Sequence, residues 1–295
     1  MTSRRNFIQS AAAMSAAVFV KNPFPVFEST PLIGLQLYTV RDAMAADPLG
    51  TLAKVAKIGY TSLELATYTG TEKFYGMDPL TFKKTLKENG LVPISGHYRL
   101  GQDLEKDEIQ NGTILHDWQK AVDDAAEVGL KYMVCAYLSD KERGDLDMYK
   151  KLANTFNKAG EICKKSGIQF CYHNHNFEFE AQANVFPYDV ILNNTDSKLV
   201  KMELDLYWVK KAGMDPMALF SKNPGRFPLW HVKDMTNTPE QAFAEVGNGI
   251  IDFKTIFKHK KDAGMKYFFV EQDKCPGSPF DSISQSIKYI KANLI

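Results

Sequence analysis

Four of the chain's six histidines fall just after short apolar runs, in company with several carboxylates. The histidines are His97, His173, His175 and His231, and the charged residues in equivalent positions are Glu64, Glu203, Asp205, Lys233 and Glu271. Imidazole and carboxylate groups are ligands that Mn, Co, Fe, Zn and Mg accept in proteins. Several carboxylates in one cleft, without a metal or other cations, would raise one another's pKa values. These residue types therefore predict a divalent-metal site.

The spacing of these residues also suggests convergence. Three pairs are separated by two positions: His173 with His175, Glu203 with Asp205, and His231 with Lys233. Alternate side chains of a strand point to the same face, so each pair shares a face if it lies on a strand. If those faces point into one cleft, imidazoles and carboxylates meet there from neighbouring strands.

The elements that must position these residues alternate in type. Apolar runs predict strands over residues 33–39, 62–66, 92–97, 132–137, 169–175, 199–204, 228–232 and 267–271. Segments of helical period follow them, from Pro48 and over 79–89, 115–128, 146–166, 188–193, 216–220, 253–263 and 282–293. Eight such units in 295 residues predict an α/β fold, a single (β/α)8 TIM barrel. The active site of a TIM barrel lies at the C-terminal ends of its strands, which is where the polar residues fall.

Further residues at the same strand ends are candidates for substrate contact. They are Gln36, Tyr38, Glu64, His97 and Trp208. The aromatic rings among them could stack on a sugar or simply pack at the rim. Glu203 could lie one layer deeper than Asp205 and pair with Lys233 or with a ligand histidine. Each of these residues also has a plain structural reading, as a solvated loop acid or a histidine bonded to backbone.

At these residues the chain resembles the sugar phosphate isomerase/epimerase superfamily, the xylose isomerase-like TIM barrels, from about Ile33 to the C-terminus. The matching stretches are GLQLY (34–38), YHNH (172–175), ELDLYW (203–208), HVKD (231–234), EVGNG (245–249) and VEQD (270–273). The YHNH segment is closer to the corresponding stretch of inosose dehydratase. The resemblance implies a xylose isomerase-like barrel.

The resemblance also implies a ligand set. Ketose epimerases of this superfamily hold a metal with a Glu, an Asp, a His and a Glu after strands five to eight. The matching residues are His173 in place of the first Glu, then Asp205, His231 and Glu271. One divalent ion, Mn, Co, Mg, Zn or Fe, is the expected cofactor. Because His173 replaces one of the two glutamates that exchange the proton in those epimerases, the pair is asymmetric here.

The activity implied by the resemblance is that of a metal-dependent sugar isomerase or epimerase. Such an enzyme removes the proton alpha to the carbonyl of a keto-sugar or sugar derivative. We expect Glu271 to be the base, His173 or His175 the acid, and Lys233 the group that holds the oxyanion. The asymmetric pair suits an alternative, a lyase or dehydratase that resembles inosose dehydratase or eliminates from a 3-keto-glycoside.

Two alternatives from other classes stay open. The first is a carbohydrate-binding barrel without turnover, and the second is a metal-dependent nuclease of the same superfamily. The net charge of +1 disfavours the nuclease, and it gives no reason to expect nucleic acid as a partner. The expected partner is a small-molecule carbohydrate, and the oligomeric state is left open, a homo-oligomer included.

The N-terminal residues read as a separate segment. Arg4 and Arg5 precede an Ala-rich stretch that ends at Val20, a pattern typical of a twin-arginine export signal. The stretch is too short to span a membrane. We therefore expect residues 1–30 to be signal and linker, 31–295 to be the barrel, and the twin-arginine translocase to export the protein. The mature protein would be periplasmic and free of the membrane.

Overall fold

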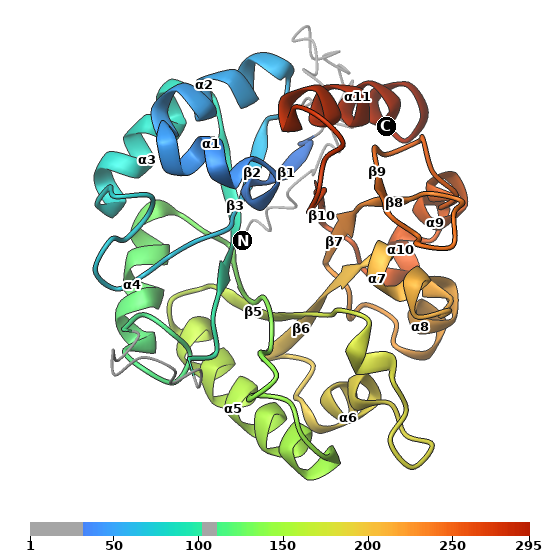
Figure 1. Ribbon diagram of the computed structural model, residues 1–295. Helices are drawn as coiled ribbons and strands as arrows, with labels where there is room; N and C mark the ends of the chain where they lie inside the picture. The colour runs from blue at the N-terminus through green and yellow to red at the C-terminus, as the bar shows by residue number, and fades with distance from the viewer. Residues whose placement is uncertain (1–31, 102–110) are drawn as a thin grey trace, which may run out of the picture. The chain divides into compact units, whose positions relative to one another are not determined.

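A ring of eight parallel strands forms the centre of the computed structural model, which describes residues 32–101 and 111–295 (Figure 1). Hydrogen bonds close the ring in the order β1-β2-β3-β4-β5-β6-β7-β10. The strands are β1 (Gly34–Gln36), β2 (Ser62–Leu65), β3 (Val92–Tyr98), β4 (Tyr132–Cys135), β5 (Gln169–His173), β6 (Val200–Asp205), β7 (Leu229–Val232) and β10 (Tyr267–Val270). This confirms the predicted single (β/α)8 TIM barrel. The predicted export signal, with Arg4 and Arg5, lies outside the described residues.

Helices surround the barrel in the positions that the helical periods predict (Figure 1). They are α2 (Pro48–Ile58), α3 (Pro79–Glu88), α4 (Trp118–Val128), α5 (Leu146–Lys165), α6 (Pro187–Asn194), α8 (Pro216–Lys222), α9 (Phe253–Lys258), α10 (Lys260–Ala263) and α11 (Pro279–Asn293). Five of them begin with Pro at the first turn, where its missing N–H costs nothing. Aspartates cap many of the starts; Asp78, for example, accepts a hydrogen bond from the Thr81 amide.

Several strands end earlier than the apolar runs predict. β1 stops at Gln36, whose side chain accepts the Tyr38 amide and starts a 3-10 turn, η1 (Leu37–Val40), before α1 (Arg41–Ala46). β6 instead ends at Asp205, just beyond the predicted range, and runs directly into α7 (Leu206–Lys211), which the Asp205 carboxylate caps at the Trp208 amide. The short helices η1, α1 and α7 were not predicted, since a brief apolar run fits a strand equally well. The early ends of β1 and β5 put Tyr38 in η1 and His175 in the loop after β5.

Below the polar strand ends, the barrel is filled by apolar side chains. Ile94, Val134, Cys171, Leu229 and Phe269, from five strands, form a buried cluster separate from the larger core shared with the helices. All four cysteines are free thiols. No helix within 32–101 and 111–295 is long and apolar enough to cross a membrane. The polar residues therefore pack on one side against a buried apolar cluster.

Candidate metal and active site

Strand register brings the polar residues together. In the closed barrel, Gln36 pairs with Glu64, His173 with Glu203, and Asp205 with His231. All six of these side chains lie almost wholly out of contact with solvent. The convergence that the spacing predicts is therefore a direct result of neighbouring strands ending at the same level. Within it, the side chains fall into two layers.

The inner layer consists of histidines and glutamates: Glu64, His97, His173, Glu203 and His231. Glu203 Oε2 lies 2.8 Å from His97 Nε2, 3.0 Å from His173 Nδ1 and 3.3 Å from His231 Nε2. Glu64 Oε2 lies 2.5 Å from His231 Nε2 and 3.2 Å from His97 Nε2. Glu203 thus pairs with histidines, one of the two partners that the sequence left open, rather than with Lys233.

Close contacts between carboxylates and imidazoles shift the pKa values of the inner-layer residues. Burial works against a charged His97, but Glu64 and Glu203 outweigh it and raise its pKa to about 9. Burial and the neighbouring Glu64 raise the pKa of Glu203 to about 7. Burial and His231 lower the pKa of His173 well below its usual range. The negative charge of these two buried carboxylates is therefore balanced by protons on some of the imidazoles. A divalent ion could supply that positive charge in place of the protons.

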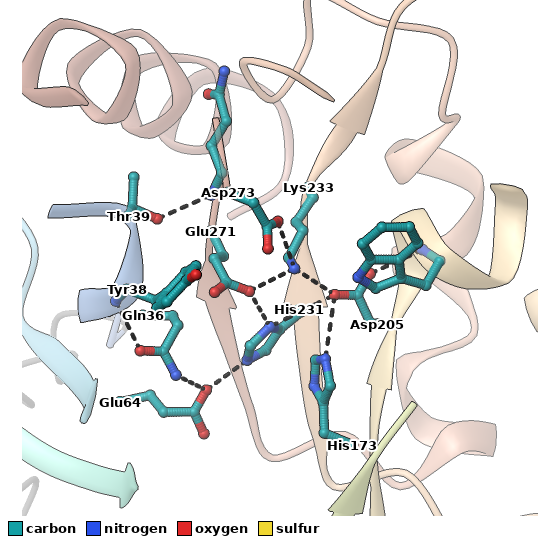
Figure 2. Close-up of polar contacts among 12 residues, drawn as sticks. Gln36, Tyr38, Thr39, Glu64, His173, Asp205, His231, Lys233, Glu271 and Asp273 are labelled. Atoms are coloured by element: carbon teal, nitrogen blue, oxygen red, sulfur yellow. Dashed lines mark hydrogen bonds and ion pairs between the residues drawn. The ribbon is translucent and has the colours of Figure 1, made fainter. Parts of the chain in front are cut away.

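The outer layer is built around one lysine: Asp205, Lys233, Glu271 and Asp273 (Figure 2). Lys233 Nζ lies 2.6 Å from Glu271 Oε2 and 2.9 Å from both Asp205 Oδ2 and Asp273 Oδ2. Burial opposes its charge, but these three carboxylates hold its pKa well above the usual range. In turn, Lys233 and His231 overcome burial and hold the pKa of Glu271 below its usual range.

His231 joins the two layers. Its Nδ1 lies 2.7 Å from Glu271 Oε2, while its Nε2 faces Glu64 (Figure 2). The same Nε2 lies 3.3 Å from Glu203 Oε2. The ring therefore stands between the outer carboxylates and the inner ones. If Nδ1 carries the proton, His231 donates a hydrogen bond to Glu271 in the outer layer. If Nε2 carries it, His231 donates to the inner carboxylates.

A cavity of about 600 Å³ opens above both layers. Its walls include Tyr38, His97, Arg99, Tyr137, His173, His175, Lys233, Glu271 and Asp273. Tyr38 and Tyr137 are 42% and 47% exposed, which is unusual for large rings and places them at the rim. The volume lies within the range of small-molecule sites.

A loop anchored by Asp234 holds Lys233 in place. The Asp234 carboxylate accepts hydrogen bonds from the amides of Gly247, Gly249 and Ile251. A Cβ on Gly249 would lie 2.3 Å from both Asp234 Oδ1 and Met235 O, so only glycine fits there. This contact explains why the HVKD and EVGNG stretches belong together.

The end of β5 is held by buried polar groups. Asn174 Oδ1 accepts the Asp205 amide and ties β5 to β6. The Glu178 carboxylate accepts the His175 amide at 2.8 Å and the Tyr172 hydroxyl at 2.5 Å. The His175 ring then packs among Tyr137, Phe177 and Trp208, with centroid separations of 5.1–5.7 Å.

The structure sorts the predicted metal ligands into two groups. Among the described residues, one group is Asp205, His231 and Glu271, and the other is His97, His173, Glu203 and His231; the ligand atoms of each lie within 4.8 Å of one another. His173 belongs to the second group, although its Nε2 lies 3.7 Å from Asp205 Oδ2. Both donor sets suit a divalent ion. Glu64 Oε1 and Glu203 Oε1 are buried without a hydrogen-bond partner in the described structure, as expected of atoms beside a cation.

The predicted substrate-contact residues differ in whether they line the cavity. Tyr38 and His97 line the cavity. Gln36 and Glu64 have no exposed surface, and Gln36 Nε2 donates to Glu64 Oε2, so their substrate contact stays a prediction. Trp208 lies behind His175, with its ring centroid 5.4 Å from the imidazole.

The predicted acid role of His173 and His175 stays a prediction. Burial and the charge of Lys233 lower the pKa of His175 to about 3, and burial and His231 lower the pKa of His173. These shifts favour the neutral form of both rings. Lys233 is a protonated group that faces the cavity.

Three residues of the site were not singled out from the sequence. Asp273 repeats the two-residue spacing after Glu271, so the rule that linked the other pairs could have found it. Tyr137 follows β4, the one strand end where the sequence shows no ionisable group. Glu178 carried no sequence signal, because its role depends on a fold of the loop after β5.

Comparisons with known proteins agree with this geometry. The sequence profile of the xylose isomerase-like TIM barrels matches residues 52–293. Inosose dehydratase of Clostridium beijerinckii is 24% identical over 271 residues, which cover 78% of this chain and 87% of that protein. The inosose dehydratase of Lacticaseibacillus casei is 24% identical over 263 residues.

Two solved structures are similar to this chain in fold. A sugar phosphate isomerase/epimerase from Parabacteroides distasonis has a TM-score of 0.75 at 30% identity, over 90% of this chain and 96% of that one. The IolI protein, solved with a bound zinc atom, has a TM-score of 0.67 at 15% identity, over 90% of this chain and 98% of that one.

Proposed function

The chain belongs to the xylose isomerase-like TIM barrel family, and we propose that it is a divalent-metal-dependent enzyme that removes the proton alpha to the carbonyl of a keto-sugar, as an isomerase or epimerase. The observation that carries this proposal is the pair of Glu271 and Lys233. A carboxylate and an ammonium group lie 2.6 Å apart in the cavity wall, above a layer of imidazoles. The sugar isomerase/epimerase similar in structure to this chain supports the reaction class.

The metal is supported by the donor sets and by the zinc atom of the IolI structure. A bound divalent ion would supply Lewis-acid polarisation of the ketone. The residues that could hold it are His97, His173, Asp205, Glu203, His231 and Glu271.

The chain's own groups account for the proton transfer. In the free enzyme, Lys233 holds the pKa of Glu271 low, which makes this carboxylate a weak base. When a substrate oxygen takes a hydrogen bond from Lys233 Nζ, Glu271 loses part of that pairing and becomes more basic. Glu271 then accepts the α-proton while Lys233 stabilises the charge that develops on the oxygen. Asp205 and Asp273 keep Lys233 in position throughout.

A second candidate is loss of water after the same first step. It is favoured by His173, which stands where ketose epimerases of the superfamily have the glutamate after strand five, and by the similarity to inosose dehydratases. In this reaction Lys233 is the group that could donate a proton to the departing hydroxyl, since His175 is neutral. The carbohydrate-binding barrel without turnover remains the alternative from another class.

The reaction in D2O separates these candidates. Metal-loaded protein is incubated with 3-keto-glucose and with a keto-inositol, and products are followed by NMR and mass spectrometry. An epimerase or isomerase gives a product of unchanged formula that carries deuterium at the α-carbon, whereas a dehydratase gives an unsaturated product lighter by one water. No exchange and no product from any keto-sugar would overturn the enzyme proposal in favour of simple binding.

We also propose that the protein is exported to the periplasm by the twin-arginine translocase, on the strength of Arg4 and Arg5 before the Ala-rich stretch. Replacement of both arginines by Lys should leave the protein in the cytoplasm. Cell fractionation measures this, and unchanged periplasmic accumulation would contradict the route.

A further inference from the structure

We propose that the substrate is a glycoside of the keto-sugar, and that Tyr137 is the surface on which its second ring, the glycosidic substituent, stacks. Tyr38 is then the surface for the sugar ring that reacts. This inference rests on the keto-sugar substrate of the proposed function and adds a second binding subsite to it.

The first argument is the exposure of two large rings inside the cavity. Tyr38 and Tyr137 line a cavity of about 600 Å³, and they are 42% and 47% exposed. Aromatic side chains that line a concave site usually contact its ligand. The C–H faces of a sugar ring, or the face of an aryl group, can pack against an aromatic ring in this way. Each tyrosine therefore offers a stacking surface to a ring of the substrate.

The second argument is the position of the two tyrosines around the barrel. β10 is the neighbour of β1 in the closed ring, whereas β4 is four strands away from β10 in either direction. Glu271, the proposed base, follows β10, and Tyr38 follows β1, so these two are neighbours at the mouth (Figure 2). Tyr137 follows β4 and stands on the opposite side.

The width of the barrel mouth then decides how large the substrate is. Eight strands spaced about 4.8 Å apart make a barrel on the order of 12–15 Å across, which is wider than a single six-membered ring. A sugar ring placed for reaction beside Glu271 contacts Tyr38 and leaves the Tyr137 side of the cavity unfilled. Contact with both tyrosines requires a part of the substrate beyond the reacting ring.

The third argument is that an arginine holds each of the two rings in place. The Arg41 guanidinium lies 4.3 Å from the Tyr38 ring centroid and donates hydrogen bonds to the carbonyls of Tyr38 and Asp273. The Arg143 guanidinium lies 5.0 Å from the Tyr137 ring centroid and donates to the Tyr137 hydroxyl. A ring that is already held loses little conformational entropy when a ligand stacks on it. Both tyrosines are therefore preorganised for stacking.

The chemistry around Tyr137 favours an uncharged ring over an anionic group. The Tyr137 ring meets the His175 ring edge-on, and His175 stacks on Phe177 with centroids 5.7 Å apart. Arg143 lies outside the described residues that line the cavity. Arg99, which follows the neighbouring strand β3, does line the cavity, and it makes a phosphorylated sugar the alternative that a test must separate.

Binding of a matched set of 3-keto-glucose derivatives tests the subsite. The full chain, loaded with metal, is titrated by calorimetry with 3-keto-glucose, its phenyl α- and β-glycosides and its 6-phosphate. We expect one phenyl glycoside to bind about 3- to 10-fold more tightly than free 3-keto-glucose, the gain expected from one aromatic contact. Equal affinities for the free sugar and both glycosides, no binding of any of these ligands, or tightest binding of the phosphate would each overturn the inference.

This binding comparison is separate from the test of the reaction. A protein that prefers the glycoside but exchanges no deuterium in D2O would have the subsite without the proposed chemistry. A protein that exchanges deuterium but shows no preference would have the chemistry without the subsite.

Paired substitutions separate the two rings. Tyr137→Ala should reduce the preference for the glycoside over the free sugar to below about twofold, because it removes the surface for the second ring. Tyr38→Ala should weaken both ligands by a similar factor and keep the preference, because its ring contacts the part that they share. Tyr137→Phe retains the aromatic face and should retain the preference.

Leu80→Ala is the matched control away from the site. It removes another exposed apolar side chain, 61% exposed on α3, and should change neither affinity. A preference that survives Tyr137→Ala, or that is lost in Tyr38→Ala instead, would contradict the assignment of the two rings.

Discussion

The two layers of the site use similar residues in different ways. In the inner layer, Glu64 and Glu203 are surrounded by imidazoles, and their spare oxygens have no partner in the described residues. In the outer layer, Glu271, Asp205 and Asp273 share a single ammonium group. The imidazoles beside the inner carboxylates can give up their protons to a metal ion, whereas the outer carboxylates are paired with a permanently charged ammonium group. The comparison supports the proposed proton transfer in the outer layer, where Glu271 and Lys233 face the cavity.

The largest effect is expected at His231, the residue that belongs to both layers. His231→Gln removes a nitrogen from the inner layer and the partner of Glu271 from the outer layer. Metal content should fall well below one ion per chain, and turnover should drop on the order of 10⁴-fold or more. Elemental analysis and steady-state kinetics measure the two effects. A variant that kept either its metal or its turnover would show that the layers are not joined through this ring.

Lys233 comes next, because its removal affects only the outer layer. Lys233→Met would leave three buried carboxylates without their cation, and the free energy of unfolding should fall by about 3–5 kcal/mol. Denaturant titration measures this. Lys84→Met is the surface control, since that side chain is 76% exposed and its loss should change stability by less than about 0.5 kcal/mol. Equal stability of the two variants would mean that Lys233 is not the centre of the outer layer.

A smaller effect is expected at the rim above both layers. Tyr137 is 47% exposed and meets the His175 ring edge-on, with centroids 5.1 Å apart. Tyr137→Ala should raise KM about threefold to tenfold and leave kcat and the unfolding midpoint nearly unchanged, because the ring offers contact area and no reacting group. Tyr137→Phe, which keeps the ring, should behave like the wild type. A large fall in kcat for the alanine variant would give Tyr137 a role in the chemistry itself.

An effect on stability alone concerns Glu178, which supports the loop that carries His175. Burial raises the pKa of this carboxyl from 4.5 to about 7. The folded state therefore binds more protons than the unfolded state between these values, and stability should fall as pH rises from about 4.5 to 7. Glu178→Gln should remove about 3 kcal/mol of this fall, seen by denaturant titration across the range. Identical pH profiles for the two proteins would contradict the shift.

Much of this molecule could be predicted from its sequence. Alternating apolar runs and helical periods gave eight strand–helix units, because period 2 and period 3.6 are visible in the order of residues. The convergence of His173, Asp205, His231 and Glu271 at one end of the barrel also followed, since parallel strands present their C-terminal ends together.

The division into layers could not be predicted in the same way. Depth within a barrel depends on where each strand stops and how each side chain turns, and neither is encoded in spacing. Glu203 and Asp205 are two residues apart on one face, yet one meets histidines and the other meets Lys233. The lowered pKa of His175 likewise depends on burial by the rings of Tyr137 and Trp208. Tyr137 follows β4 and Trp208 lies in α7, so both are far from His175 in the sequence.

The most direct test of the two-layer account compares Glu203→Gln with Glu271→Gln, with two readouts for each protein: metal per chain by elemental analysis, and α-deuterium incorporation into a keto-sugar in D2O. Glu271→Gln should exchange about 10²–10⁴-fold more slowly than the wild type, because it lacks the base. Glu203→Gln keeps that base, so its exchange should fall only as far as its metal content does. Rapid exchange without Glu271 would contradict the account.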